Sequence, residues 1–504
     1  MGRKQTEMVL LCMNEERLEY ELRALLMEFY PGEEIRLILT EDPAEEKTIG
    51  EKTAEEPQCD ALYLYYFPSG ETRIVLRCRG KETERSVPAG EFDREQKNEI
   101  KRWVYRLLSD ALGVSLPWGS LTGIRPTKLS SQMLEEGLSK EEVIERMERE
   151  YLVSRTKAVL SEEISSRERK ILSRAPFRDG YSLYVGIPFC PTRCLYCSFT
   201  GYPISAWKSR VDLYLDGVIR ELDQVSRIFR KKKLYSVYVG GGTPTTLEPE
   251  QLDRLLTALE ERFDMPSVME LTVEAGRPDS VTVEKLRVLK AHGVSRISIN
   301  PQTMKAETLK IIGRDHTPEQ IREAFAMARE EGFRNINMDL ILGLPDETAE
   351  DVERTMQEIL QMHPDNLTVH SLAIKRAARL NIERDRYRCY AYENSEEIMG
   401  ITDRYARKMG LSPYYLYRQK NMAGNLENIG YAGAEDSSAG LYNILIMEEI
   451  HSIVAVGAGS VSKCVHPDGL IERQGNVKDV NLYLERLEEL ISDKKALFDK
   501  LLSD

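Results

Sequence analysis

The sequence predicts an α/β protein built around a partial (β/α)6 TIM-like barrel, with an α+β domain before it and a C-terminal α+β capping domain after it. Two observations predict this fold class. Between residues 181 and 374, six short apolar segments alternate with helical segments, which is typical of right-handed βαβ units and a parallel sheet. The regions on either side lack this alternation. We therefore expect domains at 1–165, 175–380 and 381–504.

The six predicted strands of the core are short and rich in β-branched and aromatic residues. They are 182–187, 236–240, 269–274, 295–300, 335–342 and 366–374. The helices expected between them lie near 208–230, 249–263, 280–292, 305–312 with 317–331, and 349–362. Such an array forms an open sheet or an incomplete barrel, and in both the chemistry collects at the carboxyl ends of the strands.

The flanking regions show a mixed pattern. Before the core we expect a hairpin of 61–67 and 72–80, a helix at 93–113, a loop at 118–130 and charged helices over 139–173. After it we expect a helix at 391–409, strands at 413–419 and 451–457, and a helix at 477–502. This tail is expected to cover the mouth of the barrel.

The bulk composition excludes several classes of protein. The 504-residue chain carries a net charge of −13, which disfavours a nucleic-acid partner, and its basic stretch 227–235 is typical of a solvated helix end. No apolar run is long enough to span a membrane, and the N-terminus lacks the profile of a signal peptide. We expect a cytoplasmic protein.

Unusual residues follow the predicted strands at their carboxyl ends, which places them at one edge of the sheet. In chain order they are Cys190, Cys194 and Cys197, the run Gly240, Gly241, Gly242 and Thr243, then Glu274, then Asn300 and Gln302, then Asp339 within the fifth strand, and finally Lys375, Arg376 and Arg379. We expect this edge to carry the functional site.

Three of the eight cysteines are crowded into one C-x-x-x-C-x-x-C loop after the first strand, at Cys190, Cys194 and Cys197. Structural zinc takes four ligands, and a catalytic disulfide needs two thiols. Three thiolates can hold a cuboidal 4Fe–4S cluster and leave its fourth iron open to a small molecule. The other five are expected to be small core residues: Cys12, Cys59, Cys78, Cys389 and Cys464.

The cysteine loop, placed on the first strand of a βα array with GGGTP after the second strand, resembles that of the radical S-adenosylmethionine (SAM) enzymes. The resemblance implies a radical SAM core and a 4Fe–4S cluster whose open iron chelates SAM. One electron then cleaves the sulfonium, and the resulting 5′-deoxyadenosyl radical takes a hydrogen atom from the substrate. The glycine run would meet the methionine end of SAM, because glycines allow close backbone approach. The candidate contacts for its other polar groups are Thr243, Glu274, Asn300, Gln302, Arg314 and Asp339.

A narrower resemblance covers about residues 180–480. The segments YVGIPFCPTRCLYCSF, GGGTPT, RISINPQT, NMDLILGLP and GAGS are similar to those of the oxygen-independent coproporphyrinogen III oxidase group. With LTGIRPTKL, VHSLAIKR and YYLYRQKN, the similarity to the HemZ-type coproporphyrinogen dehydrogenases spans nearly the whole chain. It implies that Tyr184 and Phe199 lie beside the cofactor, Tyr184 with a catalytic role, and that one or two SAM molecules bind.

The implied reaction belongs to heme biosynthesis. It oxidatively decarboxylates two propionates of coproporphyrinogen III to vinyl groups, giving protoporphyrinogen IX, with an electron donor such as flavodoxin or ferredoxin. Propionates require cations, and arginine is best suited to grip a carboxylate. The candidates are Lys375, Arg376 and Arg379, with Arg418 and Lys420.

Two other functions stay open. Phe199 stands where the oxidases carry a further cysteine, and in this it is like the heme-chaperone branch of the group. A heme chaperone needs an axial ligand, for which His370, His451 and His466 are candidates. The other alternative is a different radical reaction on a tetrapyrrole, such as methylation or ring opening.

Overall fold

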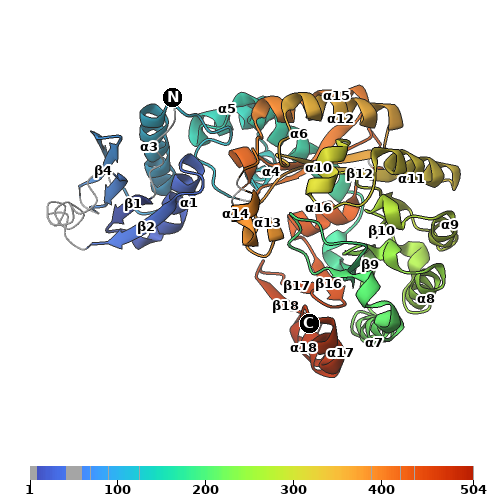
Figure 1. Ribbon diagram of the computed structural model, residues 1–504. Helices are drawn as coiled ribbons and strands as arrows, with labels where there is room; N and C mark the ends of the chain where they lie inside the picture. Colours follow the sequence, from blue (N-terminus) through green and yellow to red (C-terminus); the bar gives the residue numbers. More distant parts are fainter. Residues whose placement is uncertain are drawn as a thin grey trace. The chain divides into compact units, whose positions relative to one another are not determined.

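The computed structural model describes residues 8–40, 59–67, 70–88, 90–123, 125–387, 389–419, 422–435 and 437–502. These residues form two compact units (Figure 1). The first unit ends at Glu163 and also takes in Arg418 and Gln419, while the second runs from Ile164 to the C-terminus apart from that short segment. The division falls inside helix α6 (Arg155–Leu172).

The first unit contains a five-stranded sheet with the order β2-β1-β3-β4-β5. Its strands are β1 (Met8–Met13), β2 (Glu34–Leu39), β3 (Asp60–Tyr65), β4 (Glu71–Cys78) and β5 (Lys81–Pro88). The predicted hairpin is confirmed, since β3 and β4 pair antiparallel. The helices are α1 (Glu19–Phe29), α3 (Arg94–Leu112), α4 (Thr127–Glu135) and α5 (Lys140–Tyr151). Leu22 of α1 and Ile100 of α3 share one apolar core with Leu11 and Leu62 of the sheet.

The second unit holds the predicted βα array, and all six predicted strands are confirmed. They are β6 (Gly180–Ile187), β9 (Lys233–Gly241), β10 (Glu270–Glu274), β11 (Arg296–Ser298), β12 (Ile336–Leu342) and β13 (Asn366–Ser371). Each pairs parallel with its neighbour in the order β6-β9-β10-β11-β12-β13. The sheet curves without closing, which makes it a partial barrel.

Apart from the short α10, the connecting helices lie on the outer side of the curved sheet (Figure 1). They are α7 (Val211–Ile228), α8 (Pro249–Glu260), α9 (Val283–Ala291), α10 (Ala306–Ile311), α11 (Pro318–Glu330) and α12 (Ala349–Met362). Threonines set where several of them begin, because a threonine hydroxyl accepts a bond from a free N–H of the first turn. Thr282 caps α9, and Thr317 and Thr348 form capping boxes at α11 and α12.

The residues beyond 380 belong to the same compact unit as the array and extend its sheet at both edges. On one side β15 (Asn428–Ala432) pairs antiparallel with β13, followed by β14 (Ser412–Tyr417). On the other side β16 (Ser452–Val456) pairs parallel with β6, followed by β17 (Val461–Val465) and β18 (Ile471–Gly475). These pairings satisfy backbone groups that the outer strands of an open barrel would leave exposed.

Several predicted details of secondary structure are wrong. The loop expected at 118–130 ends early, because α4 begins at Thr127. The helix expected from 391 begins at Glu396 in α15 (Glu396–Lys408), where Ser395 supplies the cap. The helix expected over 477–502 is two helices, α17 (Val480–Glu485) and α18 (Leu487–Leu502).

None of the eight cysteines is in a disulfide. Cys12, Cys78 and Cys464 are buried as predicted, and Cys59 is half-buried. The prediction is wrong for Cys389, which is exposed. Cys389 follows α14 (Arg384–Tyr387), a helix of one turn that is too short to bury an apolar face.

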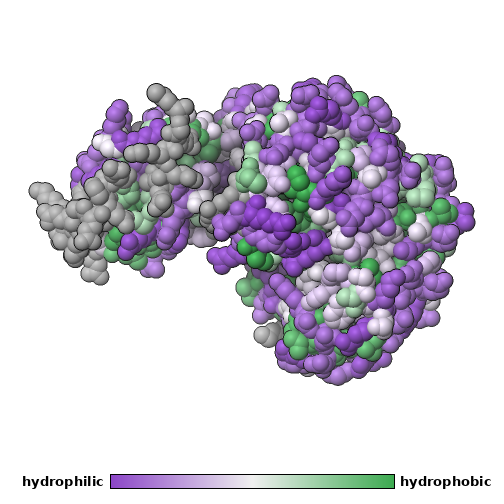
Figure 2. All heavy atoms as spheres, in the orientation of Figure 1, coloured by the Kyte–Doolittle hydropathy of each residue, from purple (hydrophilic) through white to green (hydrophobic). Residues whose placement is uncertain are grey.

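Hydrophilic residues dominate the visible face of the larger unit, and hydrophobic residues appear there in small separate patches (Figure 2). Within the parts of the chain that the structure describes, no helix is both long enough and apolar enough to cross a bilayer.

Candidate functional site

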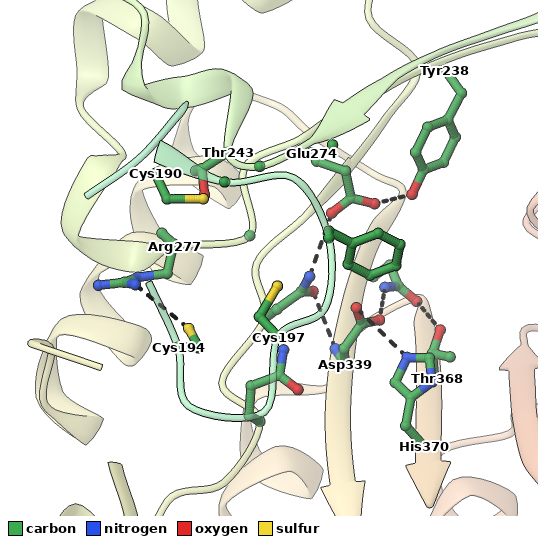
Figure 3. A pocket seen from close by; sticks show the side chains of 18 of the residues that line it. Cys190, Cys194, Cys197, Tyr238, Thr243, Glu274, Arg277, Asp339, Thr368 and His370 are labelled. Atoms are coloured by element: carbon green, nitrogen blue, oxygen red, sulfur yellow. Dashed lines mark hydrogen bonds and ion pairs between the residues drawn. The ribbon is translucent and has the colours of Figure 1, made fainter. Parts of the chain in front are cut away.

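A cavity of about 470 Å³ opens at the carboxyl ends of the parallel strands (Figure 3). It brings together most of the residues that the sequence predicts for the site. These lining residues are Tyr184, Cys190, Cys194, Cys197, Phe199, Gly241, Gly242, Thr243, Glu274, Asn300, Gln302, Arg314 and Asp339. Gly240, Lys375, Arg376 and Arg379 are not among the residues that line it.

The cysteine loop leaves β6 through β7 (Phe189–Cys190), which pairs with β8 (Tyr202–Pro203). The Thr243 hydroxyl donates to Cys190 Sγ at 3.8 Å, and Arg277 Nη1 donates to Cys194 Sγ at 3.8 Å. Burial raises the pKa of Cys190 to about 11, an effect that the neighbouring thiols reinforce. The three thiols are therefore close enough to influence one another.

The glycine run after β9 presses against the cysteine strand. A Cβ atom on Gly242 would lie 2.5 Å from Phe189 O and 2.9 Å from Cys190 Sγ, so only glycine fits there. Gly241 has φ +107°, a backbone conformation that other residues rarely adopt. Gly240 has a different role from the expected one, because its missing Cβ makes room for the Tyr238 ring, 2.8 Å away.

Glu274 is held on the wall of the cavity by three donors. The Tyr238 hydroxyl and Ser298 Oγ donate to Oε1, the latter at 3.1 Å, and Asn300 Nδ2 donates to Oε2 at 3.4 Å. Burial raises the pKa of Glu274, and the nearby Asp339 charge acts in the same direction.

Asp339 lies on the next wall, in β12. Asn337 Nδ2 donates to its Oδ1 at 2.7 Å, and His370 Nε2 lies 3.9 Å from its Oδ2. Burial opposes ionisation, but the interactions with His370 and then Asn337 lower the pKa of Asp339 below its usual value. The cavity therefore places an ionised carboxylate beside one that is easier to protonate.

Five buried polar atoms of cavity-lining side chains are unpaired in the described part of the chain, among them Gln302 Oε1 and Arg314 Nε; the others belong to Arg193 and Arg296. Gln302 also has φ +67°, an unusual backbone conformation for a residue other than glycine. Buried polar atoms are nearly always hydrogen-bonded, and exceptions concentrate at functional sites. This wall is thus able to accept a hydrogen bond from a ligand at Gln302 and to donate one from Arg314.

Stacked tyrosines form the inner wall, which the sequence interpretation missed apart from Tyr184. The Tyr238 and Tyr442 ring centroids lie 4.6 Å apart, and Tyr184 lies 6.1 Å from Tyr238. Tyr238 had a signal, because it occupies the same place in the second strand as Tyr184 in the first. Tyr442 had none, because it comes from α16 (Leu441–Glu448), far along the chain.

The cations predicted for substrate binding have different surroundings. Lys375 Nζ lies 5.6 Å from the centroid of the Phe199 ring, which is 65% exposed. Arg376 is exposed, and Arg379 pairs with Glu383 at 2.9 Å. The interpretation of Arg418 is wrong, because Arg418 is buried and pairs with Glu28 in the first unit at 2.9 Å. Lys420 lies outside the described residues.

The three candidate heme ligands also differ. His451 is buried between Ser182 Oγ at 2.9 Å and Phe177 O at 2.9 Å, so both ring nitrogens are engaged. His466 Nε2 lies 2.7 Å from Glu472. Of the three, His370 lines the cavity.

The donor set fits a cluster and SAM better than a single metal ion. Among the described residues no three His, Cys, Asp or Glu side chains converge tightly enough to hold one ion. Three free, mutually interacting thiols on one loop suit a larger Fe–S cluster. The unpaired Gln302 Oε1 and the carboxylates beside it suit the amine and hydroxyl donors of SAM.

Comparison with known proteins agrees with this geometry. The profile of the Radical SAM superfamily matches residues 184–359. The chain is 40% identical over 416 residues to the oxygen-independent coproporphyrinogen-III oxidase-like protein HemZ of Bacillus subtilis, a match covering 81% of this chain and 82% of that protein. It is 38% identical over 199 residues to the heme chaperone HemW of Lactococcus lactis, which covers 38% of this chain and 49% of HemW.

A solved structure gives the same fold. The radical SAM enzyme coproporphyrinogen III oxidase (HemN) of Escherichia coli superposes with a TM-score of 0.50 at 23% identity, over 64% of this chain and 71% of that one. The parallel sheet of β6 to β13 agrees with that likeness. The chain therefore belongs to the radical SAM family of oxygen-independent coproporphyrinogen-III oxidase-like proteins that includes HemZ.

Proposed function

We propose that this radical SAM oxidoreductase is an oxygen-independent coproporphyrinogen III dehydrogenase, which converts two propionate side chains to vinyl groups and yields protoporphyrinogen IX. The observation that carries the proposal is the composition of the cavity. Three thiols of one loop line the cavity together with the carboxylates of Glu274 and Asp339 and with two unpaired atoms, Gln302 Oε1 and Arg314 Nε. The similarity to HemZ over most of the chain supports the choice of reaction.

Cys190, Cys194 and Cys197 would hold a 4Fe–4S cluster, and the cavity beside them would hold SAM. When bound, these groups supply a one-electron cleavage of the sulfonium that creates an acceptor for a hydrogen atom. Gly242 lets the glycine run pack closely against the cysteine strand, and the run would meet the methionine end of SAM beside the cluster. Asp339, Gln302 and Arg314 would orient its polar groups by hydrogen bonds, and Tyr184 would pack beside it from the inner wall.

The substrate would dock at the mouth of the cavity. Phe199 presents an exposed apolar ring with Lys375 Nζ over it, and Arg376 and Arg379 follow Lys375 along the chain. A tetrapyrrole with four propionates combines an apolar macrocycle with negative arms and so matches this combination. Arg379 is already paired with Glu383, so we expect Lys375 and Arg376 to make the larger contributions.

The electron that reduces the cluster would come from a low-potential donor such as flavodoxin or ferredoxin, and the substrate radical would pass one electron to a separate acceptor as the vinyl group forms. We place the protein in the cytoplasm, because the three cysteines of the loop are thiols and a reducing compartment keeps thiols reduced.

An anaerobic assay tests the proposal. The reconstituted protein is incubated with dithionite, SAM and coproporphyrinogen III, and the products are followed by mass spectrometry. We expect two successive losses of the mass of formic acid, together with 5′-deoxyadenosine, and neither product without SAM. 5′-Deoxyadenosine without decarboxylation would overturn the choice of substrate and favour another reaction on a tetrapyrrole.

Heme binding is the second candidate function. The similarity to HemW and the position of His370 in the cavity favour it. Titration with heme distinguishes the two functions. Stoichiometric binding that is lost in His370→Ala, with no 5′-deoxyadenosine formed in the assay above, would support heme delivery instead of catalysis.

A further inference from the structure

Arg277 is a buried arginine that contacts the cysteine loop. The sequence interpretation did not single it out. Arg277 follows β10 in the segment EAGRPD and is 2% exposed. A guanidinium this deeply buried is rare unless it is paired, because burial of a charge is costly. Its partners therefore indicate its role.

One side of the guanidinium contacts the cysteine loop (Figure 3). Arg277 Nη1 donates to Thr192 O at 3.2 Å, to Thr192 Oγ1 at 3.1 Å and to Cys194 Sγ at 3.8 Å. Thr192 Oγ1 in turn donates to Gly313 O at 2.9 Å. One side chain thus fixes both the backbone of the loop and the direction of one thiol.

The other side of the guanidinium is held by Asp279. Arg277 Nε donates to Asp279 Oδ1 at 2.9 Å and Nη2 to Oδ2 at 2.8 Å, which is the bidentate geometry that fixes the plane of an arginine. His316, whose side chain is fully buried, places its Nδ1 3.7 Å from Asp279 Oδ1. The carboxylate leaves the guanidinium little freedom to turn away from the loop.

Two of the three thiols consequently receive hydrogen bonds from donors of different charge. Cys190 receives a hydrogen bond from the neutral Thr243 hydroxyl, whereas Cys194 receives one from a cation. A reduced Fe–S cluster carries one more negative charge than the oxidised cluster. Hydrogen bonds and positive charge at a ligating sulfur therefore stabilise the reduced state.

We infer that Arg277, oriented by Asp279, is a positioning residue that fixes Cys194 and raises the reduction potential of the cluster. The inference rests on the proposed function insofar as that places a 4Fe–4S cluster on the three cysteines. The inference assigns Arg277 an effect on the reduction potential of the cluster. This effect requires no contact between Arg277 and SAM or substrate.

The test compares Arg277→Gln and Arg277→Lys with the wild type by potentiometric titration followed by electron paramagnetic resonance. Gln removes the charge, while Lys keeps the charge and loses the planar fork. We expect reduction of the Gln variant to be about tenfold less favourable, which is about 59 mV more negative for one electron, and an intermediate shift for the Lys variant. Both should retain iron close to the wild-type content.

Arg329→Lys is the matched control. Arg329 also pairs with an aspartate, Asp365, at 2.6 Å and donates to two backbone carbonyls, but it lies at the end of α11 (Pro318–Glu330), which leads to the amino end of β12. The cluster of the Arg329→Lys variant should have the same reduction potential as the cluster of the wild type. An Arg277→Gln protein with full iron content and an unchanged potential would overturn the inference.

A second measurement covers the case in which both Arg277 variants lose iron. Amide hydrogen exchange of residues 191–197 is then compared in the iron-free proteins. Exchange about tenfold faster than in the wild type would support the positioning role, and unchanged exchange would overturn it. A wild-type protein that holds no iron on the three cysteines would overturn the proposed function itself, which is a separate outcome.

Discussion

Two buried polar clusters in the larger unit differ in how completely their charged side chains are paired. At Glu221, both carboxylate oxygens are engaged: Lys494 Nζ donates to one at 2.5 Å, and the Tyr483 hydroxyl and Gly457 N donate to the other at 2.6 and 2.7 Å. In the cavity, Gln302 Oε1 and Arg314 Nε are buried without a partner among the described residues. Both clusters combine charged and neutral polar side chains.

The difference separates a structural role from a binding role. The Glu221 cluster ties α7, α18 and the loop after β16 together, and its charges neutralise each other. An unpaired buried polar atom costs about 1–3 kcal/mol, so we propose that a bound ligand completes the pairing of Gln302 and Arg314. Substitutions in the first cluster should therefore reduce stability, and substitutions in the second should reduce binding.

Loss of one cluster ligand should have the largest effect. In Cys194→Ala we expect the bound iron to be lost and the activity to fall more than about 100-fold. This loss exceeds that expected when a residue hydrogen-bonded to a metal ligand is altered. Iron analysis and the anaerobic assay measure both. Cys389→Ala is the control, since Cys389 is exposed and outside the cavity, and it should keep its iron. A Cys194→Ala protein with wild-type iron content would refute the assignment of this ligand.

Breaking the buried ion pair should have the next largest effect. The Lys494 side chain is 3% exposed and Glu221 is fully buried, so Lys494→Met leaves an uncompensated charge and should lower the free energy of unfolding by about 3–5 kcal/mol. Denaturant titration measures this change. The exposed pair Arg220–Glu488 joins the same two helices, and Arg220→Met should cost less than about 1 kcal/mol. Equal losses in the two variants would contradict the structural role of the Glu221 cluster.

Asp339→Asn should weaken SAM binding and leave stability nearly unchanged, in contrast to Lys494→Met. The substitution removes a charge from the cavity while keeping the shape of the side chain. We expect the dissociation constant for SAM to rise about 10- to 100-fold, or about 1.4–2.8 kcal/mol, with the free energy of unfolding changed by less than about 1 kcal/mol. Calorimetric titration of the reconstituted protein and denaturant titration give the two numbers. If the variant lost stability but bound SAM normally, Asp339 would have a structural role like that of the Glu221 cluster.

The smallest effect is expected at the mouth of the cavity. Lys375→Met removes the cation above Phe199, so the KM for coproporphyrinogen III should rise about two- to fivefold with little change in kcat. Steady-state kinetics measures both constants. Lys408→Met is matched, because Lys408 lies over the Tyr405 ring at 4.4 Å, away from the cavity. The same rise in KM in both variants would remove the case for Lys375 as a substrate contact.

Local pattern predicted much of the fold. The helix predicted at 349–362 coincides with α12, because an apolar stripe and the Thr348 capping box both mark it. The cysteine loop and the glycine run could be located because each chemistry requires a fixed spacing. Their meeting at one cavity followed from the rule that parallel strands end at the same edge.

Contacts between distant parts of the chain could not be predicted. The Tyr442 ring stacks on Tyr238 only because α16 packs against the inner face of the curved sheet. Arg277 donates a hydrogen bond to Thr192, which is 85 residues earlier in the sequence. The edge pairings of β15 and β16 likewise depend on strands that lie far apart in sequence. Arg418 shows the reverse error, since its positive charge made it a candidate for binding propionates, whereas in the structure it forms an ion pair with Glu28.

The most direct test is a crystal structure of the anaerobically reconstituted protein with SAM. The account predicts a four-iron cluster joined to Cys190, Cys194 and Cys197, with Gln302 Oε1 and Arg314 Nε hydrogen-bonded to SAM or to water that it orders. The Glu221 cluster should keep the pairing described above. SAM bound elsewhere, or Gln302 and Arg314 satisfied by protein groups alone, would contradict the claim that the unpaired atoms of this cavity are its binding atoms.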